Sequence, residues 1–419
     1  MADFTKIIKN SDSYAKYMAD EITHVCNNIP KRGPGSEGEK MACEYFADVL
    51  KNQCGCERSE VERYKEHPNA FYGWIYITVT CALLAMVAFF FIPILGVALY
   101  ALGYTIMFLE FGFYKKVVDK LFPEKIGSNV TAIKKCTGET KARILFNGHP
   151  DAAWSWTFNE KFNGKVHNAV MITAIMGTIA SFVICIVASV VTKCGVGIAN
   201  PIIYGEALYY TGFAVLIFVP SLIGMYFLWN EKKVVDGASD NLSGCLISIA
   251  ILKALKDEGI ELEHTEVGVV LTGSEEAGLR GSKAWCEAHK GEFDDVPTWI
   301  YSLDTLQDPK HLMINYRNLN GTVKADKEVS DSFLEAAEEL GIPCKKGMVP
   351  PFGGATDGAA FSQAGYRAAS VAGMNHMIEK FYHTVYDTHD TLNLQALAEC
   401  FAISVKCLEN FDRNFGKNE

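Results

Sequence analysis

Long apolar runs are the strongest feature of the hydrophobic pattern, and the first, residues 71–109, contains no formal charge. As one helix it would be about 58 Å long, about twice the thickness of a bilayer's hydrocarbon core. Pro93 and Gly96 lie near its middle, which favours a hairpin of two spans. Residues 169–192 and 207–230 form a second pair, each long enough to cross a bilayer with some tilt. The pattern therefore predicts four transmembrane helices arranged as two hairpins.

The residues that flank these runs indicate their orientation. Tyr72, Trp74 and Tyr76 at one end of the first run, and Tyr114 at the other, are typical interface anchors. The flanks on one side share a basic character: Arg63, Lys65, Lys115, Lys116, Lys120, Lys161, Lys165, Lys232 and Lys233. The opposite turns carry only Lys193, so the positive-inside rule places the rest of the chain in the cytoplasm. A buried hairpin in a soluble protein is the alternative, and it is disfavoured because small domains rarely bury two wholly apolar helices.

Outside the apolar runs, the pattern changes to alternating helices and strands. Residues 11–50 have a helical periodicity broken at IPKRGPGSEGE, where Ser36 and Glu39 resemble a capping box. The expected strands are 59–64, 128–133, 142–146, 266–273, 299–304 and 366–373, and the later helices are 241–256, 330–341 and 391–411. A further helix is expected to open within SEEAGLRGSKAW. This alternation predicts an α/β fold with a mostly parallel, mixed sheet and helices on both faces.

The order of these segments predicts one soluble domain with two insertions. The domain would consist of residues 1–69, 115–154 and 232–419, and the hairpins would occupy 70–114 and 155–231. A structureless loop as long as the second insertion would be improbable inside a compact domain, so this insertion is expected to be structured.

Composition narrows the class of protein further. The chain is 49% hydrophobic and 21% charged, and its mean hydropathy is +0.09, which is apolar for a soluble protein. Its net charge of -10 argues against a nucleic-acid partner. The thirteen cysteines are scattered, which favours reduced thiols over a disulfide framework, and the charged N-terminus does not resemble a signal peptide. Both observations favour a chain that begins in the cytoplasm.

Candidate metal ligands follow the predicted strands. The stretch GHPDAAW places His149 after the strand 142–146, with Asp151 two residues on to orient the imidazole. The other candidates are Asp240 in GASDNLSG, the pair Glu275 and Glu276, Asp304 in SLD, and His383 in YHTVYDTHDTL. Taken singly, each could be a helix cap, a turn residue or a structural histidine. Because ligands of α/β sheets gather beyond the carboxyl ends of strands, the shared position favours one site.

The chemistry of this set suits a divalent metal. Two imidazoles and three carboxylates are ligands for zinc or another first-row divalent ion. A carboxylate left over beside them could deprotonate a metal-bound water.

The segments HPD, GASDNLSG, GSEEAGLRGS, SLD and YHTVYDTHDTL resemble, in this order, the motifs of the co-catalytic di-zinc metallopeptidases. This is the family of bacterial leucyl aminopeptidases and glutamate carboxypeptidase. RGPGSEGEKMACEYFADVL and ATDGAAFSQAGYRAAS are also similar to that family. The resemblance covers most of the chain apart from about 70–114 and 155–231, and it implies an aminopeptidase-like fold. The short interval between Asp304 and His383 leaves no room for the separate lid domain of related peptidases.

The resemblance also implies a role for each site residue. Two Zn²⁺ ions would share Asp240, with His149 and Asp304 completing one set of ligands and Glu276 and His383 the other. Glu275 would be the general base that takes a proton from the attacking water, and Asp151 would hold the imidazole of His149.

The expected function is that of a membrane-embedded, zinc-dependent exopeptidase, and an aminopeptidase is favoured. Hydrolysis of N-acyl amino acids or other lipid-like amides is the first alternative, because the site would lie near a bilayer. A catalytically inactive membrane scaffold is a weaker alternative, since all six ligand and base positions are filled. A transporter is disfavoured because the apolar runs contain no Asp, Glu, Lys or Arg. The expected partners are a peptide or amide substrate and the lipid bilayer, and the oligomeric state stays open.

Overall fold

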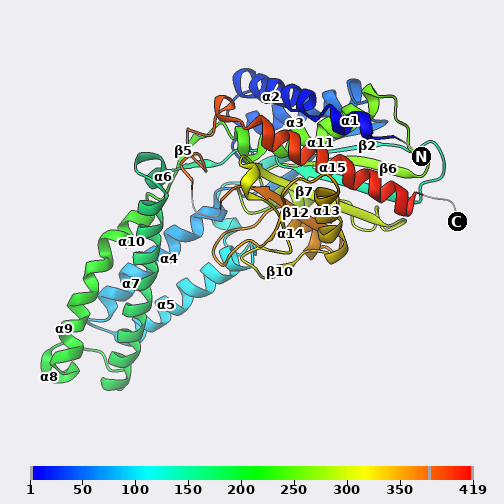
Figure 1. The fold of residues 1–419 in the computed structure, drawn as a ribbon. Coiled ribbons are helices and arrows are strands. Elements are labelled where there is room, and N and C mark those ends of the chain that lie inside the picture. Colours follow the sequence, from blue (N-terminus) through cyan, green and yellow to red (C-terminus); the bar gives the residue numbers. More distant parts are fainter. Residues whose placement is uncertain (1–2, 376–378, 417–419) are drawn as a thin grey trace. The chain divides into compact units, whose positions relative to one another are not determined.

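A computed structural model describes residues 3–375 and 379–416 and divides the chain into two compact units (Figure 1). The sheet unit consists of Met1–Pro68, Glu124–Trp154 and Lys232–Glu419. The helical unit consists of Asn69–Pro123 and Ser155–Glu231. The chain crosses from one unit to the other within β4 (Trp154–Trp156) and β5 (Trp229–Val234).

The sheet unit is built on a mixed sheet of eight strands. In spatial order these are β1 (Arg58–Glu66), β2 (Lys125–Lys134), β6 (Thr265–Thr272), β3 (Ala142–Gly148), β7 (Thr298–Leu306), β12 (Arg367–Gly373), β8 (Leu312–Asn315) and β11 (Lys345–Gly347). Strands β6, β3, β7 and β12 are parallel neighbours, whereas β1, β2 and β6 pair antiparallel. At the other edge, β8 is antiparallel to β12 and parallel to β11. The predicted α/β fold with a mixed sheet is confirmed.

Successive residues of the central strands point to opposite faces, and each face has its own apolar core. Phe146 and Tyr301 belong to the larger core, whereas Leu145 and Ile300 belong to a smaller core with Trp285. The larger core is covered by α1 (Thr5–Lys9), α2 (Ser11–Asn28), α3 (Glu37–Asn52), α11 (Ser243–Asp257), α13 (Lys327–Glu339) and α15 (Leu394–Phe415). The smaller core lies under α12 (Arg280–Ala288) and α14 (Gly358–Gln363). The near-continuous apolar character of these strands follows from burial on both faces.

The start of α3 differs from a complete capping box. Ser36 caps the helix as expected, since its hydroxyl accepts a hydrogen bond from the backbone N–H of Glu39 at 3.2 Å. The carboxylate of Glu39 does not return to the backbone of Ser36. It accepts instead from the N–H groups of Gly35 at 3.1 Å and Ser128 at 3.0 Å. A residue expected to close a local cap therefore connects α3 to β2.

Several boundaries in the sheet unit differ from the sequence prediction. Strand β7 continues past Asp304 to Leu306, and α12 begins only at Arg280, after a loop with a left-handed residue at Ser274. Strands β8 and β11 were not predicted, because runs of four and three residues are too short to show periodicity. The smaller elements are β9 (Arg317–Asn318), β10 (Val323–Lys324), η2 (Asp119–Leu121), η4 (Ala238–Leu242), η5 (Pro309–His311) and η6 (His389–Thr391).

The helical unit contains the two predicted hairpins. The first is α4 (Ala70–Ala88) and α5 (Pro93–Met107), and α5 continues into η1 (Phe108–Gly112). Pro93 opens α5 in the first turn, where its missing N–H is not needed. After α6 (Thr157–Lys161), the second hairpin pairs α7 (Gly164–Val191) with a broken arm: α8 (Pro201–Tyr204), α9 (Glu206–Ala214), η3 (Val215–Phe218) and α10 (Val219–Met225).

Five helices among the described residues are long and apolar enough to cross a membrane: Ala70–Ala88, Pro93–Gly112, Gly164–Val191, Glu206–Met225 and Ala238–Asp257. The last lies in the sheet unit and is 94% buried, so it is a core helix. The other four correspond to the predicted spans, with two corrections. The fourth span ends at Met225, ahead of strand β5, and the second extends over Glu110, a charged residue outside the predicted run. The Glu110 carboxylate is buried and accepts a hydrogen bond from the N–H of Val118 at 2.7 Å.

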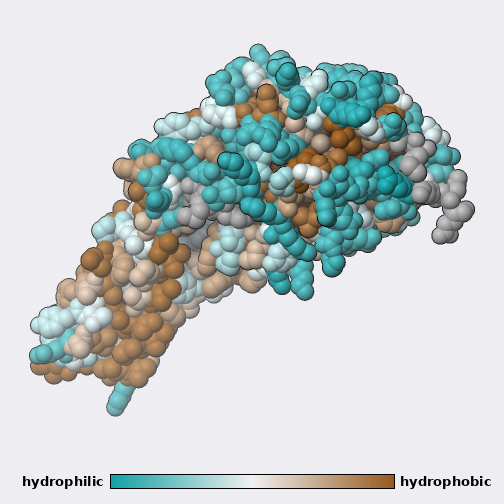
Figure 2. All heavy atoms as spheres, in the orientation of Figure 1, coloured by the Kyte–Doolittle hydropathy of each residue, from teal (hydrophilic) through white to brown (hydrophobic). Residues whose placement is uncertain are grey.

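The surface of the helical unit is apolar (Figure 2). Along α7, Ile172, Met176, Ile179 and Val183 recur at helical spacing, and each is more than half exposed. Such a continuous exposed stripe is unusual for a soluble monomer and indicates a surface that contacts another apolar medium.

Candidate metal centre

The predicted ligands come together in the sheet unit around Asp240. One carboxylate oxygen of Asp240 lies 3.4 Å from Nε2 of His149, and the other lies 3.2 Å from Nε2 of His383. Asp304 lies 3.7 Å from Nε2 of His149, and Glu276 lies 3.2 Å from Nε2 of His383. The ligand atoms form two groups, His149, Asp240 and Asp304, and Asp240, Glu276 and His383, each within 4.8 Å. Asp240 belongs to both groups, so two adjacent ions could share it.

The chain positions these side chains in more ways than the sequence predicts. His149 follows β3 directly, and Glu276 lies in the loop after β6, as expected for strand ends. Asp304 lies within β7, and Asp240 lies in η4 at the start of α11, so neither follows a strand of the main sheet. His383 lies well beyond the end of β12. The expectation that all five follow strands was therefore wrong for these three positions.

Burial raises the free-energy cost of charging the side chains of this cluster. His149, Asp240, Glu276, Asp304 and His383 are all buried. Burial opposes ionisation of Asp240, but hydrogen bonds to His149 and His383 lower its pKa below the usual range. Burial also opposes protonation of His383, yet the neighbouring Glu276 and Asp240 raise its pKa to about 10. A divalent cation could replace such protons, so this donor set fits zinc and metal binding would release protons.

Asp151 connects the first histidine to the loop that carries the glutamate pair. Its Oδ1 lies 3.4 Å from Nδ1 of His149, which leaves Nε2 facing Asp240 and Asp304. The same carboxylate accepts hydrogen bonds from the backbone N–H groups of Glu275 and Glu276, both at 3.1 Å. Asp151 is fully buried, so these interactions are shielded from water. Its contact with the glutamate loop was not foreseen from the sequence.

Asp387 makes the corresponding contact to the loop that carries Asp240, and the sequence analysis did not predict a role for this residue. Its carboxylate accepts from the backbone N–H groups of Ser239 at 2.8 Å and Asp240 at 3.0 Å. Burial raises the pKa of Asp387 to about 6, as does the charge of Asp240. The available signal was its place in YHTVYDTHDTL, four residues after His383. Two buried carboxylates, Asp151 and Asp387, thus each hold two consecutive N–H groups of a ligand-bearing loop.

Glu275 lies beside the cluster and belongs to neither metal group. Its Oε2 is 3.9 Å from Nε2 of His149, and the side chain is 9% exposed. Burial raises the pKa of Glu275 well above the usual range, although His149 opposes the shift. A buried carboxylate with a raised pKa next to a metal site suits proton transfer near neutral pH.

The model of peptidase family M28 matches residues 226–408, which is less than half of the chain. The match contains four of the five candidate ligands and Glu275, and it begins after His149. The match supports a zinc-dependent hydrolase, and it confirms the resemblance to the co-catalytic zinc metallopeptidases that was inferred from the sequence. A comparison with curated proteins finds no match.

Several solved structures have a similar fold. BSAP, a zinc aminopeptidase from Bacillus subtilis, is 12% identical with a TM-score of 0.55, and the match covers 94% of each chain. An aminopeptidase from Aneurinibacillus sp. strain AM-1 is 14% identical with a TM-score of 0.56, over 98% of this chain and 96% of that one. A glutaminyl cyclase from an Acidobacteriales bacterium is 12% identical with a TM-score of 0.53, over 96% and 95%.

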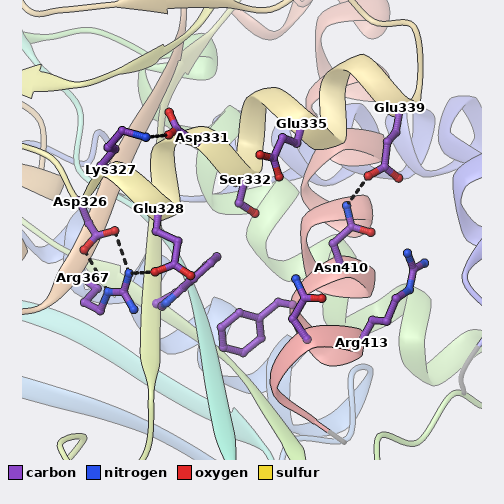
Figure 3. Close-up of a pocket in the computed structure, with 13 residues that line it drawn as sticks. Asp326, Lys327, Glu328, Asp331, Ser332, Glu335, Glu339, Arg367, Asn410 and Arg413 are labelled. Carbon is purple, nitrogen blue, oxygen red and sulfur yellow. Dashed lines mark hydrogen bonds and ion pairs between the residues drawn. The ribbon is translucent and has the colours of Figure 1, made fainter.

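A separate groove in the sheet unit lies against α13 and α15 and has a volume of about 690 Å³ (Figure 3). None of the candidate metal ligands lines it. Its charges largely satisfy one another, because Arg367 is paired with Asp326 and Glu328, and Asn410 donates to Glu339 at 3.0 Å. The groove therefore adds no group to the candidate metal centre.

Proposed function

We propose that this chain is a membrane-embedded, two-zinc exopeptidase that acts as an aminopeptidase. The observation that carries the proposal is the shared position of Asp240 between two ligand groups, with Glu275 beside them. His149 and Asp304 would complete one zinc site, and Glu276 and His383 the other. When bound, two zinc ions lower the pKa of a water molecule and polarise a carbonyl oxygen.

The residues of the chain would then perform the proton transfers. Glu275 accepts a proton from the attacking water as the carbonyl carbon is attacked, and delivers it to the leaving amine nitrogen. Asp151 keeps Nδ1 of His149 oriented and fixes the backbone of Glu275 through the 3.1 Å hydrogen bond. Asp387 fixes the backbone of Asp240 in the same way. These contacts would keep Glu275 and Asp240 in fixed positions relative to each other during turnover.

The exposed apolar stripe of α7 supports insertion of the helical unit into a lipid bilayer. The basic residues that flank the apolar runs support a cytoplasmic sheet unit by the positive-inside rule. The aminopeptidase class is favoured because two of the similar structures are aminopeptidases. The apolar helical unit also favours a second candidate, hydrolysis of N-acyl amino acids or other lipid-like amides.

The test is a substrate comparison with the full-length protein purified in detergent. Aminoacyl-nitroanilides, dipeptides and N-acyl amino acids are assayed with zinc, after chelation, and after zinc is restored. The proposal predicts chelator-sensitive hydrolysis of substrates with a free amino terminus. Activity confined to the N-acyl compounds would replace the aminopeptidase with an amidohydrolase. Absence of zinc-restored hydrolysis on every substrate would contradict a catalytic role.

A further inference from the structure

A buried serine next to the proposed general base lies between two buried carboxyl groups. The hydroxyl oxygen of Ser274 is 2.6 Å from Oε2 of Glu39 and 2.6 Å from Oε1 of Glu66. All three side chains are at most 3% exposed. A hydroxyl has one proton and can donate to only one of these oxygens. The other close contact therefore requires a proton on a carboxyl group.

The remaining contacts identify which carboxyl group carries that proton. Both oxygens of Glu39 face backbone donors: Oε1 accepts from Ser128 at 3.0 Å, and Oε2 lies 3.1 Å from the N–H of Gly35, which is also 3.1 Å from the hydroxyl oxygen of Ser274. These two N–H groups stabilise the charged form of Glu39, whereas burial and the charge of Glu66 raise its pKa well above the usual range. The second oxygen of Glu66 receives no hydrogen bond from any described residue, so no donor stabilises a negative charge on that oxygen. We therefore assign the proton to Glu66, which has fewer donors than Glu39, and the hydrogen bonds then run from Glu66 to Ser274 to Glu39.

This chain of hydrogen bonds ends on the loop that presents Glu275. Ser274 directly precedes Glu275 and has a left-handed backbone conformation, with a φ of 52°, which is unfavourable for serine unless its surroundings hold it. The preceding Gly273 is held as well: the hydroxyl of Tyr64 donates to its carbonyl at 2.8 Å, and its N–H donates to Asn129 at 3.0 Å. Residues of α3, β1 and β2 thus determine the direction in which the loop leaves β6.

We propose that Glu39 and Glu66 are positioning residues for the general base: they share one proton through Ser274 and hold the turn that aims Glu275. The inference rests on the proposed function, because it assumes that Glu275 accepts the proton of the attacking water. It extends the site to two acids that contact neither the reacting atoms nor the metal ligands.

The surroundings of Glu66 give the arrangement a pH dependence. Burial raises its pKa to about 7, and Asp151 acts in the same direction, whereas Ser274, Arg280 of α12 and Lys125 of β2 oppose the shift. Glu39 and Tyr64 also face this group. Above pH 7, loss of the proton would place a second negative charge opposite Glu39 and remove the hydrogen bond to Ser274. The turn should then loosen.

The test compares conservative and disruptive variants of the full-length, zinc-loaded protein. In Glu66→Gln the amide nitrogen can donate to Ser274, so kcat at pH 6 should stay within about two-fold of wild type. Glu66→Ala and Glu39→Gln should lower kcat by about 10- to 100-fold with little change in KM, because a small displacement of a catalytic group has effects of this size. Glu39→Gln is disruptive because its amide NH₂ must face a backbone N–H. Glu37→Gln, on the exposed side of α3, is the matched control.

Two pH profiles complete the test. The kcat of wild type should decline as the pH rises through about 7, and Glu66→Gln should lack this decline because an amide does not ionise. A decline that persists in Glu66→Gln, or a loss in Glu66→Gln as large as in Glu66→Ala, would overturn the inference. So would a Glu39→Gln variant that behaves like Glu37→Gln.

A second readout does not depend on turnover and separates this inference from the proposed function. The folded pKa of Glu66 lies above its ordinary value, so the folded state binds the extra proton and loses stability as the pH rises from about 4.5 to 7. The Tm of Glu66→Gln should therefore increase relative to wild type over that interval and then stay constant. Equal Tm differences at pH 5 and pH 7 would contradict the shared proton even if the protein hydrolysed no amide.

Discussion

The two units of the chain place apolar and charged side chains in opposite ways. The sheet unit buries Phe146 and Tyr301 and also buries an acidic cluster around Asp240. The helical unit exposes Ile172 and Ile179, and the apolar runs of its hairpins contain no formal charge. Buried charges are costly without a partner, and exposed apolar stripes are costly in water. The acidic cluster of the sheet unit therefore suits a cation, and the exposed stripe of the helical unit suits an apolar medium.

The largest effect is expected at Glu275, whose buried carboxylate is the proposed general base. Glu275→Gln keeps the size of the side chain and removes its ability to accept a proton. We expect kcat to fall by about 10²- to 10⁴-fold, the usual range for a general base, with an unchanged zinc content. Steady-state kinetics and metal analysis measure both quantities. Glu287→Gln, at an exposed position of α12, is the control and should match wild type.

A Glu275→Gln variant with wild-type kcat would show that the acidic cluster is structural at this position. The buried acidic cluster of the sheet unit would then contribute to folding at this position and not to catalysis.

The next effect concerns the exposed apolar stripe of α7 and its proposed contact with the lipid bilayer. Ile179→Lys places a charge in the middle of the exposed stripe of α7, which should cost about 3 kcal/mol on membrane insertion. We expect less protein in the membrane fraction, measured by quantitative blotting after carbonate extraction. Leu394→Lys is the matched control, because Leu394 is 43% exposed in the sheet unit and should tolerate lysine.

If both lysine variants stayed at the wild-type level in the membrane fraction, the stripe of α7 would not contact lipid. The helical unit would then need a protein partner to cover it.

A smaller effect is expected at Asp387, which contacts the backbone of Asp240 and is not itself a ligand. Asp387→Asn puts an amide NH₂ opposite one of two backbone N–H groups. We expect zinc affinity to fall by about 10- to 100-fold, as is usual when a group that orients a ligand is lost. Competition with a chromogenic chelator measures this. Asp390→Asn is the control, because its side chain is 81% exposed.

Equal zinc affinity in the Asp387→Asn and Asp390→Asn variants would show that the loop around Asp240 keeps its shape without Asp387. Asp151 would then be the more important of the two buried supports.

The sequence predicts the fold and the candidate ligands well because both leave local signals. Short apolar runs mark β3, β6 and β7, and the histidines and acids stand in recognisable motifs such as YHTVYDTHDTL. Contacts between distant segments leave no such signal. Asp387 meets the N–H groups of Ser239 and Asp240 only in the folded chain.

Glu39 also shows that a local sequence motif does not predict contacts with distant segments. Its spacing from Ser36 predicts a local capping role, which is what a capping box requires. In the structure its carboxylate is directed to Ser128 and Ser274, in strands and loops that lie far along the chain. A local motif can therefore give the correct position of a helix start and still misplace the function of one of its side chains.

The most direct test of the two-metal account is anomalous diffraction at the zinc edge from crystals of the full-length protein in detergent. We predict two peaks on either side of Asp240, one between His149 and Asp304 and the other between Glu276 and His383. A single peak, or peaks that do not contact Asp240, would contradict the shared ligand. Absence of any peak after crystals are soaked in zinc would contradict the metal centre itself.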